Sequence, residues 1–142
     1  MRLARQTTRR GRPALEDPEI RQRLAALEGH VRAHQYSGFR QLTRDARCQD
    51  PGILALMNKL VSTNIGHEVA RIALDLLGDE GLLAPGEREG VVPRGGAGWL
   101  AYAMGSLGSA IAGGTSNIQR NIIAERGLGL PRDPAAERSS GS

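Results

Sequence analysis

Apolar positions recur at alternating intervals of three and four residues along the first long segment of the chain. The stripe consists of Ile20, Leu24, Leu27, Val31, His34, Gly38 and Leu42. This spacing places its members on one face of an α-helix. A capping residue, a proline and an acid precede the stripe, in the order typical of a helix start: Asp17, Pro18 and Glu19. The pattern predicts one long amphipathic helix that ends near residues 44–47.

A second long segment carries apolar residues on more than one helical face. Asp50 followed by Pro51 predicts its start, and Gly78 predicts its end. The apolar residues between these signals are Ile53, Leu56, Met57, Leu60, Ile65, Val69, Ile72, Leu76 and Leu77. Because they cover a wide surface, we expect this helix to be buried against two or more neighbours and to leave part of its apolar face available for self-association.

Two shorter helices are expected after a long surface loop over residues 79–98, which are rich in Gly, Pro, Glu and Arg. The first should span about residues 98–112 and end at Gly113 and Gly114. The second should be capped at Thr115 and Ser116, place Ile118, Ile122 and Ile123 on one face, and end at Gly127. The whole pattern predicts an all-α fold, an antiparallel four-helix bundle.

The composition agrees with a single helical domain. The chain has 142 residues, of which 39% are hydrophobic and 24% charged, and only four residues are aromatic. This length allows one domain with a sizeable core, and the scarcity of aromatic residues favours helix packing over a β-sandwich. We divide the chain into a basic lead segment (residues 1–16), a helical bundle (residues 17–131) and a polar tail that we expect to be disordered (residues 132–142).

Most of the net charge of +4 comes from the N-terminal arm. Residues 1–12 carry five arginines and no acid: Arg2, Arg5, Arg9, Arg10 and Arg12. The run Arg10-Gly11-Arg12-Pro13 resembles the core of an AT-hook, in which an extended Arg-Gly-Arg enters the minor groove of A·T-rich DNA. An alternative function is therefore that of a small helical interaction protein whose basic arm binds nucleic acid. The simpler interpretation is a solvated basic arm.

Other features of the chain exclude several classes of protein. No charge lies between Arg94 and Arg120, but seven glycines interrupt this stretch, so we expect no membrane span. The single Cys48 allows no intramolecular disulfide, and no apolar signal segment follows the basic N-terminus, so we expect a cytoplasmic protein. His30 and His34 lie four residues apart, without an acid or a cysteine placed beside them, and we expect no metal site.

The run Gly113-Gly114-Thr115-Ser116-Asn117 has the composition of an anion site. Two glycines let a ligand approach the backbone closely. The free N–H groups in the first turn of the next helix, together with the helix dipole, favour a phosphate group. An ordinary helix corner with a Thr or Ser cap has the same composition, so this run alone leaves both interpretations open.

The longer sequence over residues 113–132, GGTSNIQRNIIAERGLGLPR, resembles the C-terminal signature of the acyl-CoA dehydrogenases, particularly the bacterial ones. Leu76-Leu77-Gly78-Asp79-Glu80-Gly81 is similar to the Gly-rich corner of that family. Arg5-Gln6-Thr7 is similar to its Arg-x-Thr flavin contact. The three matches occur in the family's order, and the resemblance covers about residues 1–132.

The resemblance implies a helical C-terminal domain that helps to hold FAD at a dimer interface. Gly114, Thr115 and Asn117 would contact the FAD of their own subunit, and Arg5, Thr7 and Gly78 would reach the FAD of the partner. The complete enzymes of this family oxidise the Cα–Cβ bond of an acyl-CoA thioester and pass the electrons from FAD to an electron-transfer flavoprotein. The N-terminal and middle domains that complete the flavin and acyl pockets do not occur in this sequence.

The chain departs from the family pattern at two places. Gly113 occupies the position at which many members have the glutamate that removes the α-proton, and glycine cannot accept a proton. The base would then lie on an earlier helix, before Met1, or this chain would resemble the base-lacking subunit of a heteromeric bacterial enzyme. Thr8-Arg9 stands where the family has Phe-Gly after the Arg-x-Thr. The sequence leaves the acyl substrate open, with a steroid side chain or a branched acyl group as alternatives, and it leaves homo- and hetero-oligomers open as well.

Overall fold

The computed structural model describes residues 1–50, 52–82 and 98–132. Its elements, in chain order, are α1 (Arg2–Gln6), β1 (Thr8–Arg9), β2 (Arg12–Pro13), the 3-10 helix η1 (Ala14–Glu16), α2 (Pro18–Ala46), α3 (Ile53–Leu77), the 3-10 helix η2 (Gly78–Leu82), α4 (Trp99–Ile111), α5 (Ser116–Ile122) and the π-helical turn η3 (Ile123–Gly127). The prediction of an all-α fold is confirmed, with one two-stranded hairpin added.

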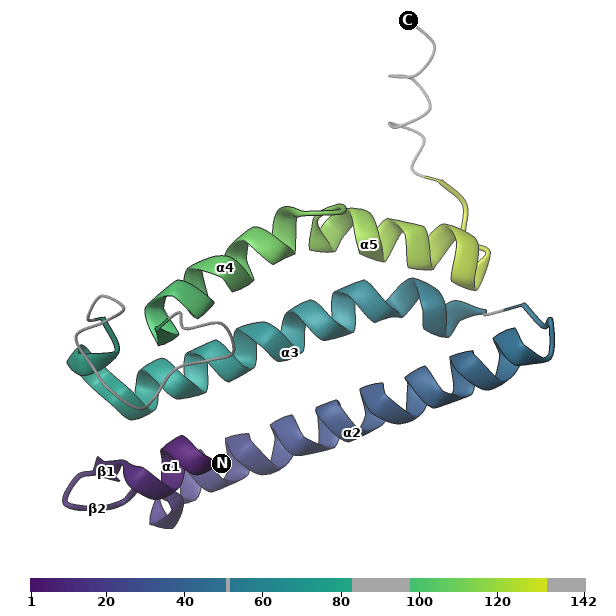
Figure 1. Ribbon diagram of the computed structural model, residues 1–142. Helices are drawn as coiled ribbons and strands as arrows, with labels where there is room; N and C mark the ends of the chain where they lie inside the picture. Colours follow the sequence, from purple (N-terminus) through teal and green to yellow (C-terminus); the bar gives the residue numbers. More distant parts are fainter. Residues whose placement is uncertain (51, 83–97, 133–142) are drawn as a thin grey trace, which may run out of the picture.

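The helices form three tiers (Figure 1). α3 is the middle tier and packs against α2 on one side and against α4 and α5 on the other. α2 and α3 run antiparallel, and α4 and α5 lie nearly end to end on the outer side of α3. The bundle therefore has its predicted helices in their predicted order, but the last two share one tier instead of forming two separate columns.

Local signals at most helix ends act as predicted. The Asp17 side chain accepts a hydrogen bond from the Glu19 N–H at 2.9 Å and caps α2, with Pro18 at the first helical position. Gly78, at φ +57°, ends α3. The expected Asp50 cap is wrong, because the N-cap of α3 is Gly52. Asp50 instead accepts a hydrogen bond from the Gly52 N–H at 2.8 Å, in a turn just before the helix.

Residues 1–16, the predicted basic lead segment, fold back onto the bundle. Ala4 of α1 and Ala14 of η1 are fully buried. They belong to a core cluster that also contains Ile20, Leu24, Ile72 and Leu76. The N-terminal segment therefore builds the end of the core at which α2 begins and α3 ends.

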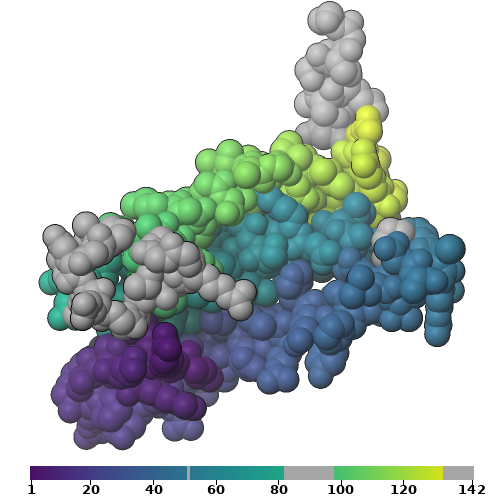
Figure 2. Space-filling model, in the orientation of Figure 1, coloured from purple at the N-terminus to yellow at the C-terminus, as the bar shows by residue number. Residues whose placement is uncertain are grey.

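The predicted stripe of α2 is buried only at its N-terminal end. Ile20 and Leu24 are buried, whereas Val31 and Leu42 are exposed, the latter to 67%. The physical reason is that α1, η1 and the end of α3 share one core cluster with the first turns of α2. Farther along, α3 is the described helix that packs against α2. The outer side of α4 is also apolar and exposed, with Met104, Leu107 and Ile111. Figure 2 shows α4 and α5 along one outer edge of the molecule.

The exposed apolar surface does not lie on the helix for which it was predicted. We expected it on the helix over residues 51–77, but Met57 is the only large hydrophobic residue of α3 that counts as exposed. Because α3 is the middle tier, its other large hydrophobic residues are buried or half-buried. The larger exposed apolar residues lie on the outer tiers, on α2 and α4.

Two predicted segments lie largely outside the described residues. The loop expected over residues 79–98 is described only at its ends, where η2 occupies Gly78–Leu82. The expected disordered tail is described only at Arg132, whose Nε lies 3.1 Å from Glu125 Oε2 in an ion pair. Within the described residues, no helix has both the length and the apolar character that crossing a membrane requires.

Candidate functional site

Gly113 and Gly114 form the turn that joins α4 to α5, which we call the diglycine turn. Their φ angles are +67° and +100°, a backbone region that glycine adopts without strain. A Cβ on Gly113 would meet nothing within 4 Å, whereas a Cβ on Gly114 would lie 3.1 Å from Gln119 Nε2. Glycine at position 113 is therefore favoured by the positive φ alone. At position 114 it is favoured both by the positive φ and by the close contact with Gln119.

Two side chains from different helices hold the diglycine turn in place. Lys59 of α3 donates through Nζ to the carbonyl oxygen of Ala110, at 3.1 Å, and to that of Gly114. Gln119 of α5, whose exposure is only 8%, donates through Nε2 to the carbonyl oxygen of Gly113 at 2.8 Å. Neither residue is among the site residues predicted from the sequence. A signal was present for Lys59, which is the only lysine among 19 basic residues.

The first turn of α5 presents hydrogen-bond donors to solvent. Thr115 is its N-cap, and the Thr115 side chain accepts a hydrogen bond from the Ile118 N–H at 3.4 Å. The N–H groups of Ser116 and Asn117 have no partner within the helix, as at any helix start. Thr115 and Asn117 are exposed, and Asn117 Oδ1 accepts a hydrogen bond from Arg120. This set of backbone donors, a hydroxyl, an amide and a nearby arginine fits a phosphate group.

The other three predicted site residues lie elsewhere. Arg5 is exposed, and its guanidinium has no ion pair among the residues that the structure describes. Thr7 donates its hydroxyl to the carbonyl oxygen of Leu3 at 2.9 Å. α1 lies at the end of the molecule at which α3 reaches Gly78, while the diglycine turn lies on the far side of α3 (Figure 1). The structure therefore separates the six predicted residues into two groups that do not meet within one chain.

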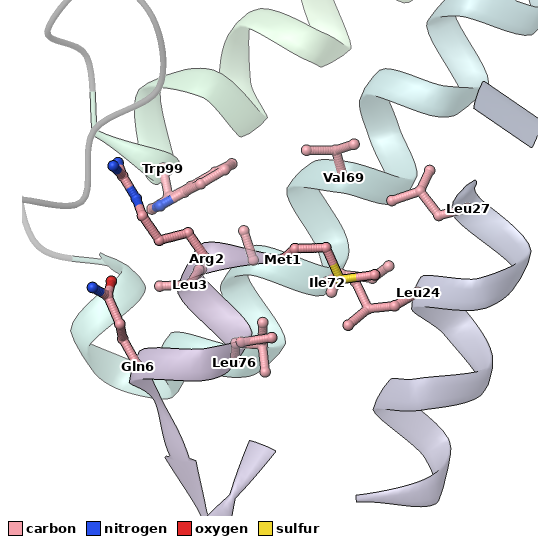
Figure 3. Close-up of a pocket in the computed structure, with 12 residues that line it drawn as sticks. Met1, Arg2, Leu3, Gln6, Leu24, Leu27, Val69, Ile72, Leu76 and Trp99 are labelled. Carbon is pink, nitrogen blue, oxygen red and sulfur yellow. The ribbon is translucent and has the colours of Figure 1, made fainter. Parts of the chain in front are cut away.

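An apolar cavity of about 330 Å³ lies between α1, α2, α3 and the first residue of α4 (Figure 3). Its walls include Leu24, Leu27, Val69 and Ile72, and the Met1 side chain extends between them. The Nε1 atom of Trp99 is buried beside it without a hydrogen-bond partner among the described residues. No local spacing in the sequence pointed to this cavity, because four separate elements build it.

The Arg-Gly-Arg run of the basic arm is folded into a hairpin. Thr8 pairs with Pro13 and Arg9 with Arg12, and both turn residues, Arg10 and Gly11, have positive φ. Arg9 is also paired with Asp17 at 3.3 Å and with Glu19 at 3.4 Å. An AT-hook enters the minor groove as an extended segment, so this hairpin differs from the conformation that the nucleic-acid alternative requires.

No group of three or more His, Cys, Asp or Glu side chains in the described part of the chain is placed to hold a metal ion. Cys48 is exposed and free.

Comparison with known proteins assigns this architecture. A sequence profile described as "Acyl-CoA dehydrogenase, C-terminal domain" matches residues 1–128. Acyl-CoA dehydrogenase IpdE1 of Mycobacterium tuberculosis is 33% identical over 132 residues, and its counterpart of the same name in Mycolicibacterium smegmatis is 35% identical over 121 residues. These alignments cover 92% and 84% of this chain but only 30% and 28% of the two relatives.

A solved structure agrees with the two sequence relatives. The Tcur3481-Tcur3483 steroid ACAD superposes with a TM-score of 0.67 at 26% sequence identity. The superposition covers 84% of this chain and 30% of that one. The chain thus spans less than a third of the length of each of these relatives.

Proposed function

The chain belongs to the acyl-CoA dehydrogenase family. We propose that it acts as a helical domain that binds the adenosine diphosphate half of FAD. The observation that carries this proposal is the diglycine turn followed by the donor-rich start of α5. Gly113 and Gly114 give the turn its left-handed backbone, and Thr115 and Asn117 supply a hydroxyl and an amide beside free backbone N–H groups. The family resemblance of residues 113–132 supports the diphosphate of FAD as the phosphate ligand.

Each residue of this site has a defined task. The N–H groups of Ser116 and Asn117 bind phosphate oxygens, and the helix dipole adds to their attraction. Arg120, held beside Asn117, adds positive charge to the same face. When bound, FAD supplies the acceptor for the hydride that leaves Cβ of an acyl-CoA thioester.

We propose a second set of FAD-binding residues, which consists of Arg5, Thr7 and Gly78. They lie away from the diglycine turn, so we assign them to the FAD of an adjoining subunit. A guanidinium matches a diphosphate well, since it offers paired donors and a permanent charge, and the Arg5 side chain is exposed and free to provide them. The exposed apolar sides of α2 and α4 support assembly into a homo- or hetero-oligomer.

The complete reaction needs groups that this chain does not supply. Gly113 has no side chain to accept the α-proton, so the base must come from another segment or another subunit. We propose a steroid acyl-CoA as the substrate of the complete enzyme, because the Tcur3481-Tcur3483 relative is a steroid ACAD. An electron-transfer flavoprotein is the proposed electron acceptor.

Titration of the chain with FAD, ADP and riboflavin, followed by calorimetry, tests the cofactor proposal. ADP should compete nearly as well as FAD, because both carry the diphosphate that the turn grips, and riboflavin should not bind. Preference for riboflavin over ADP would contradict the proposed site. Binding to a mixed-sequence DNA duplex at physiological salt, without affinity for FAD or ADP, would favour the nucleic-acid alternative instead.

A further inference from the structure

Lys59 uses its ammonium group entirely within the fold. It lies in the middle tier on α3, and its Nζ donates to two carbonyl oxygens, that of Ala110 near the end of α4 and that of Gly114 in the diglycine turn. It has no ion pair with a carboxylate among the described residues. We infer that Lys59 is a positioning residue, which orients the backbone of the diglycine turn so that the start of α5 can bind a diphosphate. This inference rests on the proposed function.

The need for Lys59 follows from the hydrogen bonds of the turn. In a continuing helix the Ala110 carbonyl would accept from the Gly114 N–H, but that N–H bonds to Ile111 at 3.2 Å. The Ala110 carbonyl is thus left at the C-terminal end of α4, where a cation is favourable. Lys59 satisfies it and reaches Gly114 as well, so the end of α4 and the start of α5 are fixed to α3 by one side chain.

The Gly114 contact sets the direction of a donor. The peptide unit between Gly114 and Thr115 is planar and trans, so its C=O and its N–H point in opposite directions. Since Lys59 binds the Gly114 carbonyl oxygen from α3, the Thr115 N–H points away from Lys59. Lys59 therefore acts on the ligand through the backbone and not by direct contact.

Two substitutions separate this role from simple attraction of an anion. Lys59→Met removes the charge and the donors at similar length, whereas Lys59→Arg keeps the charge but replaces the compact ammonium with a longer planar group. Ser62→Ala is the matched control, because Ser62 lies one turn further along α3 and only donates to the Lys59 carbonyl. The readouts are ADP affinity by calorimetry and the ¹H–¹⁵N resonance of Thr115 in the full chain without ligand.

We expect Lys59→Met to weaken ADP binding about tenfold and Lys59→Arg to weaken it by roughly three- to tenfold, on the scale of one hydrogen bond to a charged group. Both variants should shift the Thr115 amide resonance before ADP is added, and Ser62→Ala should change neither readout. Far-UV circular dichroism verifies that each variant is folded. Lys59→Gln, which keeps N–H donors on a shorter, uncharged side chain, replaces Lys59→Met if that variant does not fold.

Three results would overturn the inference. Unchanged ADP affinity in Lys59→Met would show that Lys59 only stabilises the fold, while the proposed function would stand. Full affinity in Lys59→Arg with loss in Lys59→Met would show that the charge acts directly on the ligand. Absence of ADP and FAD binding by the unmodified chain would reject the proposed function, and the positioning role with it.

Discussion

The side-chain amide of Gln119 donates to the carbonyl oxygen of Gly113 at 2.8 Å, across the diglycine turn. Gly113, which the sequence resemblance aligns with the family's glutamate base, is therefore held by a buried polar side chain from the following helix. Gly113 offers no base, but its backbone has a defined and stabilised conformation. The conformation of the turn is thus stabilised by the side-chain hydrogen bonds of Lys59 and Gln119, and each of these can be removed by a single substitution.

Replacing Gln119 with Met removes the donor and keeps the side-chain volume. The Gly113 carbonyl then loses its partner, and the free energy of unfolding should fall by about 1–2 kcal/mol. Urea unfolding followed by circular dichroism measures the change. Gln22→Met on the exposed surface of α2 is the control and should leave the urea midpoint unchanged. Equal midpoints for Gln119→Met and the control would show that the contact contributes nothing.

Substitutions at Gly113 and Gly114 should differ in severity. A side chain at Gly113 has open space but must adopt a left-handed φ, so Gly113→Ala should destabilise the chain by about 1 kcal/mol. Gly114→Ala should destabilise it more, because its Cβ would also press on Gln119. Gly113→Asn should lie between the wild type and Gly113→Ala, since Asn tolerates this region better. The reverse order of the two alanine variants in urea unfolding would contradict this account.

Gly113→Glu should not create an active enzyme from this chain. The new carboxylate would stand where the resemblance of residues 113–132 aligns the family's glutamate base, but these 142 residues span less than a third of the length of the relatives that they match. We expect no acyl-CoA oxidation with an artificial electron acceptor, either before or after the substitution and with FAD added. Turnover by either protein would contradict the assignment of this chain as a cofactor-gripping part without its own base.

The local sequence signals predicted the helix ends well, except at Asp50, where the same residue type is typical both of a helix cap and of a turn before a helix. Asp17 and Gly78 act as expected, because a cap depends on neighbouring residues only. Asp50 does not, because an Asp side chain can bond to the N–H two residues ahead both at a cap and in a turn before a helix. The choice between these depends on where the following helix packs.

Local sequence patterns could not predict which part of an apolar face is buried, nor which residues far apart in the chain are in contact. The apolar stripe of α2 identifies a face, but only the tertiary arrangement decides that Leu24 is covered and Leu42 is not. Lys59 is 51 residues from Ala110 and 55 from Gly114 in the chain. No spacing rule connects them. The six site residues named from the sequence are placed by the structure in two groups, and their binding roles stay predictions.

Thr115→Val should weaken ADP binding by about 2- to 10-fold, the equivalent of one side-chain hydrogen bond. The same change removes the cap of α5, so the variant should also lose roughly 1 kcal/mol of stability. Thr115→Ser, which keeps the hydroxyl, is the control and should retain most of the affinity. Calorimetry well below the unfolding temperature separates the two effects. Similar weakening by Thr115→Ser would mean that the hydroxyl is not what the ligand contacts.

Arg23 joins α2 to α3 through Glu68, at 3.1 Å, and through Asp75. The hydrogen bond to Asp75 raises the pKa of Arg23 above its ordinary value, and the bond to Glu68 adds to it. A raised pKa means that the stabilisation is complete below the ordinary pKa of arginine and is lost only above it, at strongly alkaline pH. Arg23→Met should therefore lower the unfolding free energy across neutral pH, by about 1–2 kcal/mol. Arg32→Met, which breaks an exposed pair within α2, should leave the urea midpoint within error.

The apolar outer side of α4 should drive self-association of the chain. Met104, Leu107 and Ile111 lie three or four residues apart on this helix, and their exposures of 61%, 57% and 70% leave a continuous apolar strip. No charged residue lies between Trp99 and Gln119 to oppose contact with a second apolar surface. We expect dimers or tetramers by light scattering at micromolar concentration. Leu107→Glu should shift them toward monomers, because a buried unpaired carboxylate is costly, whereas Arg71→Glu, on the exposed surface of α3, should not. A monodisperse monomer of the unmodified chain would show that α4 is not an association surface.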